Sequence, residues 1–109
     1  MADSALDRLF KIIASRRGGD VTKAYTTLLL KEGAAKCAKK FGEESVEVVL
    51  AAVAKDKKSL IAESADVLYH LLVVWAACGV APKEVYAALA AREKQSGLAE
   101  KSARKRKPA

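Results

Sequence analysis

The acidic residues in the middle of the chain recur at the spacing of one face of an α-helix. Six acids belong to this set, in the stretches KFGEESVEVV and LIAESADVLYH and in the polar run between them: Glu43, Glu44, Glu47, Asp56, Glu63 and Asp66. Side chains three or four residues apart stack on one helical face. The pattern therefore predicts a helical hairpin with acids on both arms.

An antiparallel hairpin that turns at residues 55–58 sets which acids face each other. Residues at the same level of two antiparallel helices have numbers with a constant sum. That sum is 110 for Glu44 with Asp66 and also for Glu47 with Glu63. Four carboxylates therefore occupy two neighbouring levels of one groove, about one helical turn apart at about 1.5 Å per residue.

Carboxylates so close together repel each other and raise each other's pKa values unless a cation lies among them. Oxygen ligands of this kind suit Mg²⁺, with Mn²⁺ as the alternative. A single acid on a helix face is usually solvated. Both arms are nevertheless flanked by apolar residues: Val46, Val48, Val49, Leu50, Val67, Leu68, Leu71 and Leu72. An acidic cluster within core-forming sequence favours a metal site over a solvated surface.

The composition indicates one all-α domain. The chain has 109 residues, of which 51% are apolar but only 6% aromatic, with six glycines and two prolines. Such a chain can bury one core and favours helix over sheet. We expect helices over 3–17, from Thr26 or Thr27 as cap to Glu32, and then over 34–55, 57–78 and 82–95, with Asp56 as N-cap and Gly79 as terminator.

Apolar positions on three of the expected helices define the packing. Inward positions are predicted at Ala38, Phe41, Val48, Val49 and Ala52 in the helix over 34–55, and at Val85, Tyr86, Leu89 and Ala90 in the last helix. From Val67 onward the helix over 57–78 is apolar on nearly every side, so it must be covered all round. We therefore expect a helical bundle, built around the antiparallel hairpin and completed by homodimerisation.

The net charge of +7 is concentrated at the C-terminus. Residues 99–109 contain five basic residues and one acid, a net of +4, which leaves +3 for the remainder. We divide the chain into a domain over 1–98 and a basic tail over 99–109. A basic tail attracts phosphates without selecting among them, so it does not by itself indicate a nucleic-acid-binding protein.

The cysteines, the N-terminal sequence and the longest apolar run predict a cytoplasmic protein. Cys37 and Cys78 lie in helical sequence without a CxxC pair, which argues against a zinc site or a disulfide framework. The N-terminus, MADSALDRLF, does not read as a signal peptide. The most apolar run, Leu71 to Ala81, is shorter than the roughly 20 residues of a membrane span.

The order Glu44-x-x-Glu47 and then Glu63-x-x-Asp66 resembles the ExxE…ExxD signature of the all-α nucleoside triphosphate pyrophosphohydrolase (MazG-like) superfamily. Within that superfamily, KKFGEESVEVVLAA and ESADVLYHLLV are similar to the phosphoribosyl-ATP pyrophosphohydrolase family of histidine biosynthesis. The likeness extends from about Tyr25 to Lys101. The family often has Ser where this chain has Ala24, and the loop GGDVTK is not the usual one, so no phosphate or ribose contact is carried over for that loop.

The resemblance implies hydrolysis of the α–β phosphoanhydride of phosphoribosyl-ATP to phosphoribosyl-AMP and pyrophosphate. It implies metal ligands at Glu44, Glu47, Glu63 and Asp66. Glu43 is either an outer group or the base that orients the attacking water. The remaining implied residues contact the substrate: Lys40 as a phosphate clamp, Lys39 as a weaker one, and Tyr25, Thr26 and Lys101.

Three questions stay open from the sequence. A lone His in an apolar helix is more often a hydrogen-bonded structural residue, so His70 is left out of the chemistry although it should face Lys40. A house-cleaning pyrophosphohydrolase acting on another nucleotide would share the same metal site. A basic helical module that binds nucleic acid explains the tail but not the inward acids, which would repel phosphate without a metal.

Overall fold

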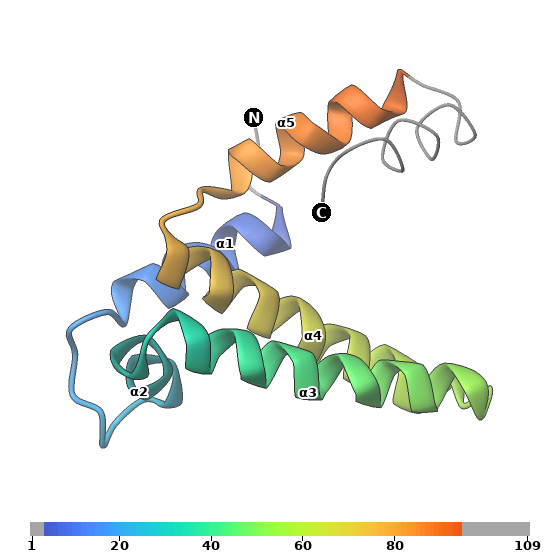
Figure 1. Ribbon diagram of the computed structural model, residues 1–109, viewed down its shortest axis with the longest axis horizontal. Helices are drawn as coiled ribbons and strands as arrows, with labels where there is room; N and C mark the ends of the chain where they lie inside the picture. Colours follow the sequence, from blue (N-terminus) through green and yellow to red (C-terminus); the bar gives the residue numbers. More distant parts are fainter. Residues whose placement is uncertain (1–3, 95–109) are drawn as a thin grey trace.

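The computed structural model describes residues 4–94. Within that range the chain forms five α-helices and no strand: α1 Ala5–Ser15, α2 Tyr25–Glu32, α3 Ala34–Val53, α4 Lys57–Cys78 and α5 Pro82–Glu93 (Figure 1). The all-α prediction is confirmed. The tail over 99–109 and its boundary at residue 98 lie outside the described residues.

Helices α3 and α4 form an antiparallel hairpin and share the largest helix–helix contact (Figure 1). At the turn, the Asp56 carboxylate accepts hydrogen bonds from the Ser59 N–H at 3.1 Å and the Ser59 hydroxyl at 2.8 Å, which caps α4. Lys55 has a φ of 56°, and this left-handed conformation ends α3 two residues before its predicted end. Gly79, with φ 73°, terminates α4 as predicted.

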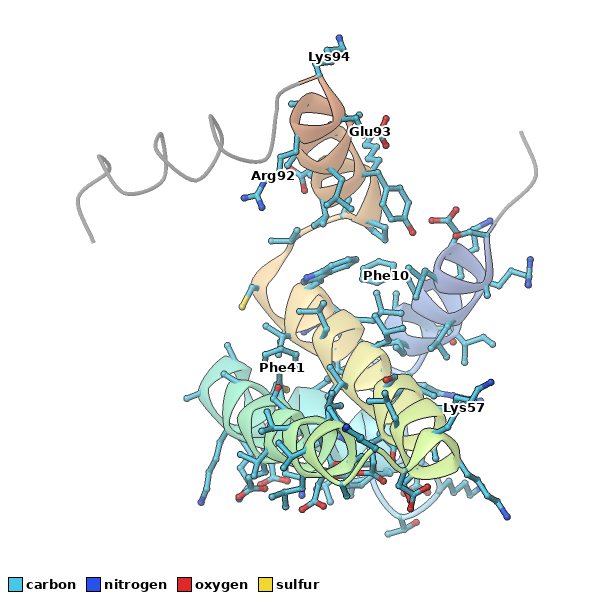
Figure 2. All side chains as sticks on the ribbon, turned by 90° about the vertical axis from the view of Figure 1, so that its right-hand side faces the viewer. Phe10, Phe41, Lys57, Arg92, Glu93 and Lys94 are labelled. Atoms are coloured by element: carbon cyan, nitrogen blue, oxygen red, sulfur yellow. The ribbon has the colours of Figure 1, made fainter. Side chains whose placement is uncertain are left out.

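The core lies where α1 and α2 pack against the first turn of α3 and the second half of α4. Six buried residues make it up: Ile13, Leu29, Leu30, Cys37, Leu72 and Val73. Tyr69 and Trp75 of α4 pack against this cluster. Phe10 lies between α1 and the start of α5 (Figure 2). The thiols of Cys37 and Cys78 are both free.

The predicted cap of α2 was wrong. Ala24 occupies the N-cap position and makes no side-chain hydrogen bond, so the helix begins at Tyr25. Thr26 and Thr27 instead use their hydroxyls for tertiary contacts. The Thr26 hydroxyl bonds to the Tyr69 hydroxyl, and the Thr27 hydroxyl donates to the Arg16 carbonyl at 2.7 Å.

The predicted inward face of α3 was only partly right for the single chain. The residues of α3 buried in this chain are Cys37 and Ala51, whereas Val49 is 58% exposed. Ala38 and Ala52 are exposed, and Phe41 and Val48 are half-buried. The reason is that α4 packs against the Cys37 side of α3, so the stripe around Val49 faces away from the core. In α5, Val85 and Tyr86 are half-buried as predicted, but Leu89 and Ala90 are exposed.

Helix α4 is long and apolar enough to cross a membrane, judged by length and composition alone. A single such helix is weak support for a membrane span, because the core helix of a soluble protein passes the same test. Only 17% of its apolar window is buried within this chain. The expected need for another layer over α4 therefore remains.

Candidate metal and nucleotide site

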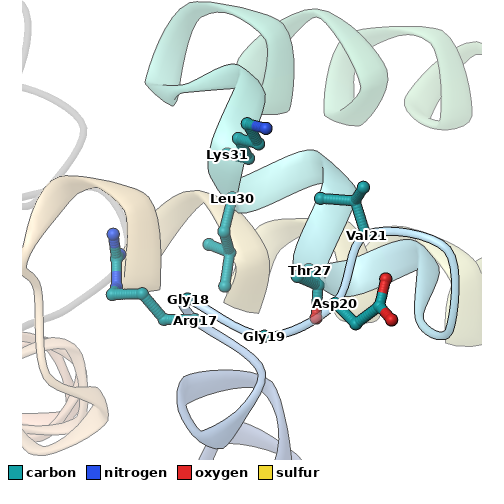
Figure 3. Close-up of a pocket in the computed structure, with 8 residues that line it drawn as sticks. All are labelled: Arg17, Gly18, Gly19, Asp20, Val21, Thr27, Leu30 and Lys31. Atoms are coloured by element: carbon teal, nitrogen blue, oxygen red, sulfur yellow. The ribbon is translucent and has the colours of Figure 1, made fainter.

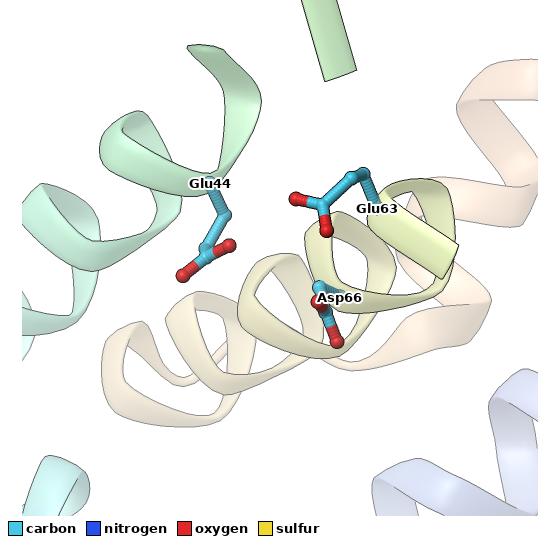
Figure 4. Close-up of side chains that lie close together, drawn as sticks. All are labelled: Glu44, Glu63 and Asp66. Carbon is cyan, nitrogen blue, oxygen red and sulfur yellow. The ribbon is translucent and has the colours of Figure 1, made fainter. Parts of the chain in front are cut away.

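Carboxylates from both arms of the hairpin converge in the groove between α3 and α4. One oxygen each from Glu44, Glu63 and Asp66 lies within 4.8 Å of the other two (Figure 4). Glu44 and Glu63 are half-buried and Asp66 is exposed. Glu63 and Asp66 share a face of α4 because they are three residues apart, and Glu44 reaches them from α3. We call these three residues the acid trio.

The electrostatics of the acid trio favour a cation. Burial raises the pKa of Glu63, and the neighbouring carboxylates of Asp66, Glu47 and Glu44 raise it further. Oxygens around one Mg²⁺ stand up to about 4.2 Å apart, twice the metal–oxygen bond length of about 2.1 Å. Small side-chain movements would therefore bring the acid trio onto a single ion. Donor chemistry and spacing both fit Mg²⁺ or Mn²⁺.

Glu47 lies beside the acid trio rather than within it. Its exposed side chain lines, with Glu63, a cavity of about 270 Å³ that continues toward the hairpin turn. The other walls of that cavity are Leu50, Ala51, Ala54, Asp56 and Ser59. Glu47 is thus close enough to Glu63 to raise the pKa of Glu63.

The other end of the groove carries Lys40. Its ammonium nitrogen is 3.3 Å from Oε1 of Glu43, one turn further along α3. This pair raises the pKa of Lys40, with a smaller contribution from Tyr25. Glu43 is therefore turned toward Lys40. Lys39 is exposed, and Lys101 lies outside the described residues.

His70 lies next to these groups, on the face of α4 that also carries Asp66. Its side chain is 6% exposed, and its ring meets Tyr69 edge-on at a centroid distance of 4.9 Å and Tyr25 at 6.4 Å. Burial lowers the pKa of His70, while the charges of Glu44 and Asp66 act in the opposite direction. In the described part of the chain, Nδ1 of His70 is the only buried side-chain nitrogen or oxygen without a hydrogen-bond partner. Sequence reasoning left this residue out of the site.

Another cavity lies away from the acid trio. It measures about 560 Å³, lies between the α1–α2 loop and α2, and is lined by Arg17, Gly18, Gly19, Asp20, Val21, Thr27, Leu30 and Lys31 (Figure 3). Its one acid, Asp20, is engaged locally by the N–H and hydroxyl of Thr22. The chemistry of the acid trio, and not the size of this cavity, locates the candidate site.

Comparison with known proteins identifies the family. A family model described as phosphoribosyl-ATP pyrophosphohydrolase matches residues 6–93. The chain belongs to this family. Relatives named phosphoribosyl-ATP pyrophosphatase include those of Paramagnetospirillum magneticum, 53% identical over 94% of both chains, and Parvibaculum lavamentivorans, 54% identical over 93% of both. A third, from Azospirillum brasilense, is 50% identical over 94% of this chain and 92% of its own.

The match to the phosphoribosyl-ATP pyrophosphohydrolase family spans nearly the whole described structure, from α1 to the end of α5. It includes the acid trio, Glu47, Lys40 and His70. The family resemblance drawn from the acidic motif is confirmed. The match ends before the basic tail.

Proposed function

We propose that this chain hydrolyses the α–β phosphoanhydride of phosphoribosyl-ATP, which yields phosphoribosyl-AMP and pyrophosphate, the second step of L-histidine biosynthesis. The observation that carries the proposal is the acid trio, assembled from two helices in a chain of this family. Relatives that are about half identical over more than nine-tenths of both chains bear the corresponding name. A biosynthetic enzyme of this kind is expected in the cytoplasm.

The acid trio would hold Mg²⁺, or alternatively Mn²⁺, and Glu47 would complete the ligand set from the turn side. When bound, the cation neutralises polyphosphate charge and provides an activated water. The four carboxylates place a dense negative charge in the groove, so a polyphosphate is accepted only together with a cation. This requirement excludes free anions from the site.

Lys40 would bind a phosphate oxygen of the nucleotide. In the free protein it is held by Glu43, so substrate binding exchanges one anionic partner for another. Glu43, released from Lys40, would then orient the attacking water without binding the metal, or would accept a proton from that water. Tyr25, Thr26 and, from the tail, Lys101 would contact the substrate, and Lys39 would add positive charge nearby.

The active form is proposed to be a homodimer. Support comes from apolar side chains of the hairpin that are exposed in the single chain: Val46 55%, Val49 58%, Leu50 57%, Val53 76%, Ile61 63% and Leu68 43%. Residues this apolar rarely gather on a monomer surface. The domain over 1–98 would form the catalytic dimer, and within the tail over 99–109 the residues beyond Lys101 would only assist substrate encounter.

Pyrophosphate release from phosphoribosyl-ATP, measured beside ordinary nucleoside triphosphates, tests the function. We expect turnover of phosphoribosyl-ATP, its loss with EDTA, and its return with Mg²⁺ or Mn²⁺. Turnover of other nucleoside triphosphates alone would instead support a house-cleaning enzyme. Full activity in metal-free buffer would rule out the proposed role of the acid trio.

A further inference from the structure

The unpartnered nitrogen of His70 is the feature that the proposed chemistry leaves unexplained. A buried polar atom without a hydrogen bond destabilises the folded protein, and native structures contain few of them. The described residues offer Nδ1 no partner, although His70 is only 6% exposed. A ligand that supplies the missing hydrogen bond would remove that cost when it binds.

The two tyrosines beside His70 differ in how firmly they are held. Tyr69 is half-buried, and its hydroxyl bonds to that of Thr26, which ties α4 to α2. Tyr25, the first residue of α2, is 51% exposed and meets the imidazole edge-on. The Tyr25 ring can therefore turn toward solvent without opening the core, and access of a ligand in the groove to His70 requires this movement.

The position of His70 along α4 matches the layout of a nucleotide. It lies four residues from Asp66 on the same helical face, about 6 Å at 1.5 Å per residue. In a nucleotide the ribose follows the α-phosphate after one methylene group. If the reacting α-phosphate lies at the acid trio, Lys40 can reach it from one turn before Glu44 on α3, and a ribose pointing toward Tyr25 comes to the level of His70.

A hydroxyl is the group that best fits this nitrogen. Burial lowers the pKa of His70, so the imidazole is neutral and each of its nitrogens either donates or accepts. An ionised phosphate oxygen only accepts. A hydroxyl does both, so it satisfies Nδ1 in either tautomer.

We propose that His70 is a substrate-contacting residue that hydrogen-bonds a ribose hydroxyl of the nucleotide, while the turned ring of Tyr25 covers the sugar. This proposal rests on the proposed function only in requiring a nucleotide whose α-phosphate lies at the acid trio. It gives the groove a direction. The nucleoside lies toward α2, and the leaving pyrophosphate lies toward Glu47 and the hairpin turn.

The test compares ribose and deoxyribose substrates. Pyrophosphate release is measured for phosphoribosyl-ATP and for its 2′-deoxy and 3′-deoxy counterparts in the adenosine ribose. The proteins are the wild type, His70→Phe, which removes both nitrogens, and His70→Asn, which keeps a polar group near Nδ1. Tyr69→Phe is the control, because it breaks a nearby hydrogen bond that does not involve His70. Calorimetric binding of AMP, 2′-deoxy-AMP and 3′-deoxy-AMP gives a readout that needs no turnover.

The wild type should prefer the ribose form over one deoxy form by about fivefold to tenfold, mainly through KM, as expected for one hydrogen bond. His70→Phe should lose that preference, His70→Asn should retain part of it, and Tyr69→Phe should keep it. A wild type that treats all three sugars alike would overturn the proposal. So would a His70→Phe variant that loses activity equally on each substrate, since His70 would then be structural.

The proposed function can fail separately. If the wild type does not cleave phosphoribosyl-ATP but cleaves another nucleotide, the same sugar comparison is made with that nucleotide and with the AMP series. A sugar preference that depends on His70 would then support this inference alone.

Discussion

Glu63 is the acid whose ionised form most clearly disfavours the folded protein, although metal binding needs that ionised form. Its carboxyl is partly desolvated, and three other acids raise its pKa. The ionised form is therefore less favourable in the folded protein than in the unfolded chain. Replacing this acid with a neutral amide of the same shape removes an unfavourable charge and a metal ligand together.

We predict opposite effects of Glu63→Gln on stability and on activity. In EDTA at neutral pH the variant should melt at the same temperature as the parent or slightly higher. With Mg²⁺ the parent should gain thermal stability and the variant should gain less, since the cation binds the folded state. kcat/KM should fall by at least about 100-fold, the upper end of what the loss of an outer ligand partner costs.

Glu32→Gln is the matched control for Glu63→Gln. Glu32 is an exposed acid at the end of α2 and is not part of the acid trio. It should change neither the metal-dependent gain in melting temperature nor kcat/KM. If Glu63→Gln unfolds the metal-free protein, Glu63 is a structural residue and the proposed metal role is wrong.

Helical periodicity and the position of the hairpin turn determine most of the candidate site. They are local properties, so the sequence predicts Glu44 opposite Asp66 and Glu47 opposite Glu63. The structure instead brings Glu44 to both Glu63 and Asp66 and leaves Glu47 beside them. The orientation of Glu43 toward Lys40 depends on a choice among side-chain rotamers, which spacing does not fix. The surroundings of His70 depend on Tyr25, which belongs to α2 and is far from His70 in the sequence.

Among the elements, α5 is held in place by a hydrogen bond that depends on one carboxylate. Helix α5 contacts α1 more than it contacts any other helix. The Tyr86 hydroxyl of α5 donates a hydrogen bond to Oδ1 of Asp7 in α1 at 2.9 Å. The pKa of Asp7 is lowered, first by the hydrogen bond from the Ser4 N–H and then by that from Tyr86. The stabilisation from this carboxylate is therefore present above its ordinary pKa of 3.8 and is lost as the pH falls through the lower, folded-state value.

We predict that Tyr86→Phe lowers the urea midpoint at pH 7, and that its difference from the wild type shrinks as the pH falls below 3.8. A protonated Asp7 is a weaker acceptor, so at low pH the wild type loses the stabilisation from the Tyr86–Asp7 hydrogen bond. Tyr86→Phe lacks this hydrogen bond at every pH. Tyr25→Phe is the control, because Tyr25 makes no such bond to Asp7. If Tyr86→Phe lowers the urea midpoint by the same amount at pH 7 and at pH 3, this account is wrong.

Helix ends were predictable where one residue determines them. Asp56 caps α4, Gly79 stops it and Pro82 starts α5, each through its own backbone or side-chain chemistry. The start of α2 was not predictable in this way, since Thr26 and Thr27 bond to Tyr69 and Arg16 rather than to their own helix. The inward face of α3 was only partly right because apolar spacing does not say which apolar stripe meets α4.

Within residues 4–94, an apolar surface on the outer side of the hairpin is left uncovered. We call it the outer stripe, and its residues are Val46, Val49 and Val53. The sequence gives this stripe the same apolar character as a core face, yet the single chain exposes more than half of each side chain. A second copy of the hairpin packed against the outer stripe would bury it.

We predict that Val49→Glu converts a dimer into a monomer. Val49 is 58% exposed in the single chain, so the charge is solvated in a monomer but would be desolvated in a dimer that buries the outer stripe. The dimer dissociation constant should rise at least about 100-fold, which sedimentation at micromolar concentration detects. Ile12→Glu is the control, because Ile12 is 52% exposed on α1 and lies off the stripe. A wild type that sediments as a stable monomer, or a Val49→Glu variant that stays dimeric, would show that the outer stripe is not the interface.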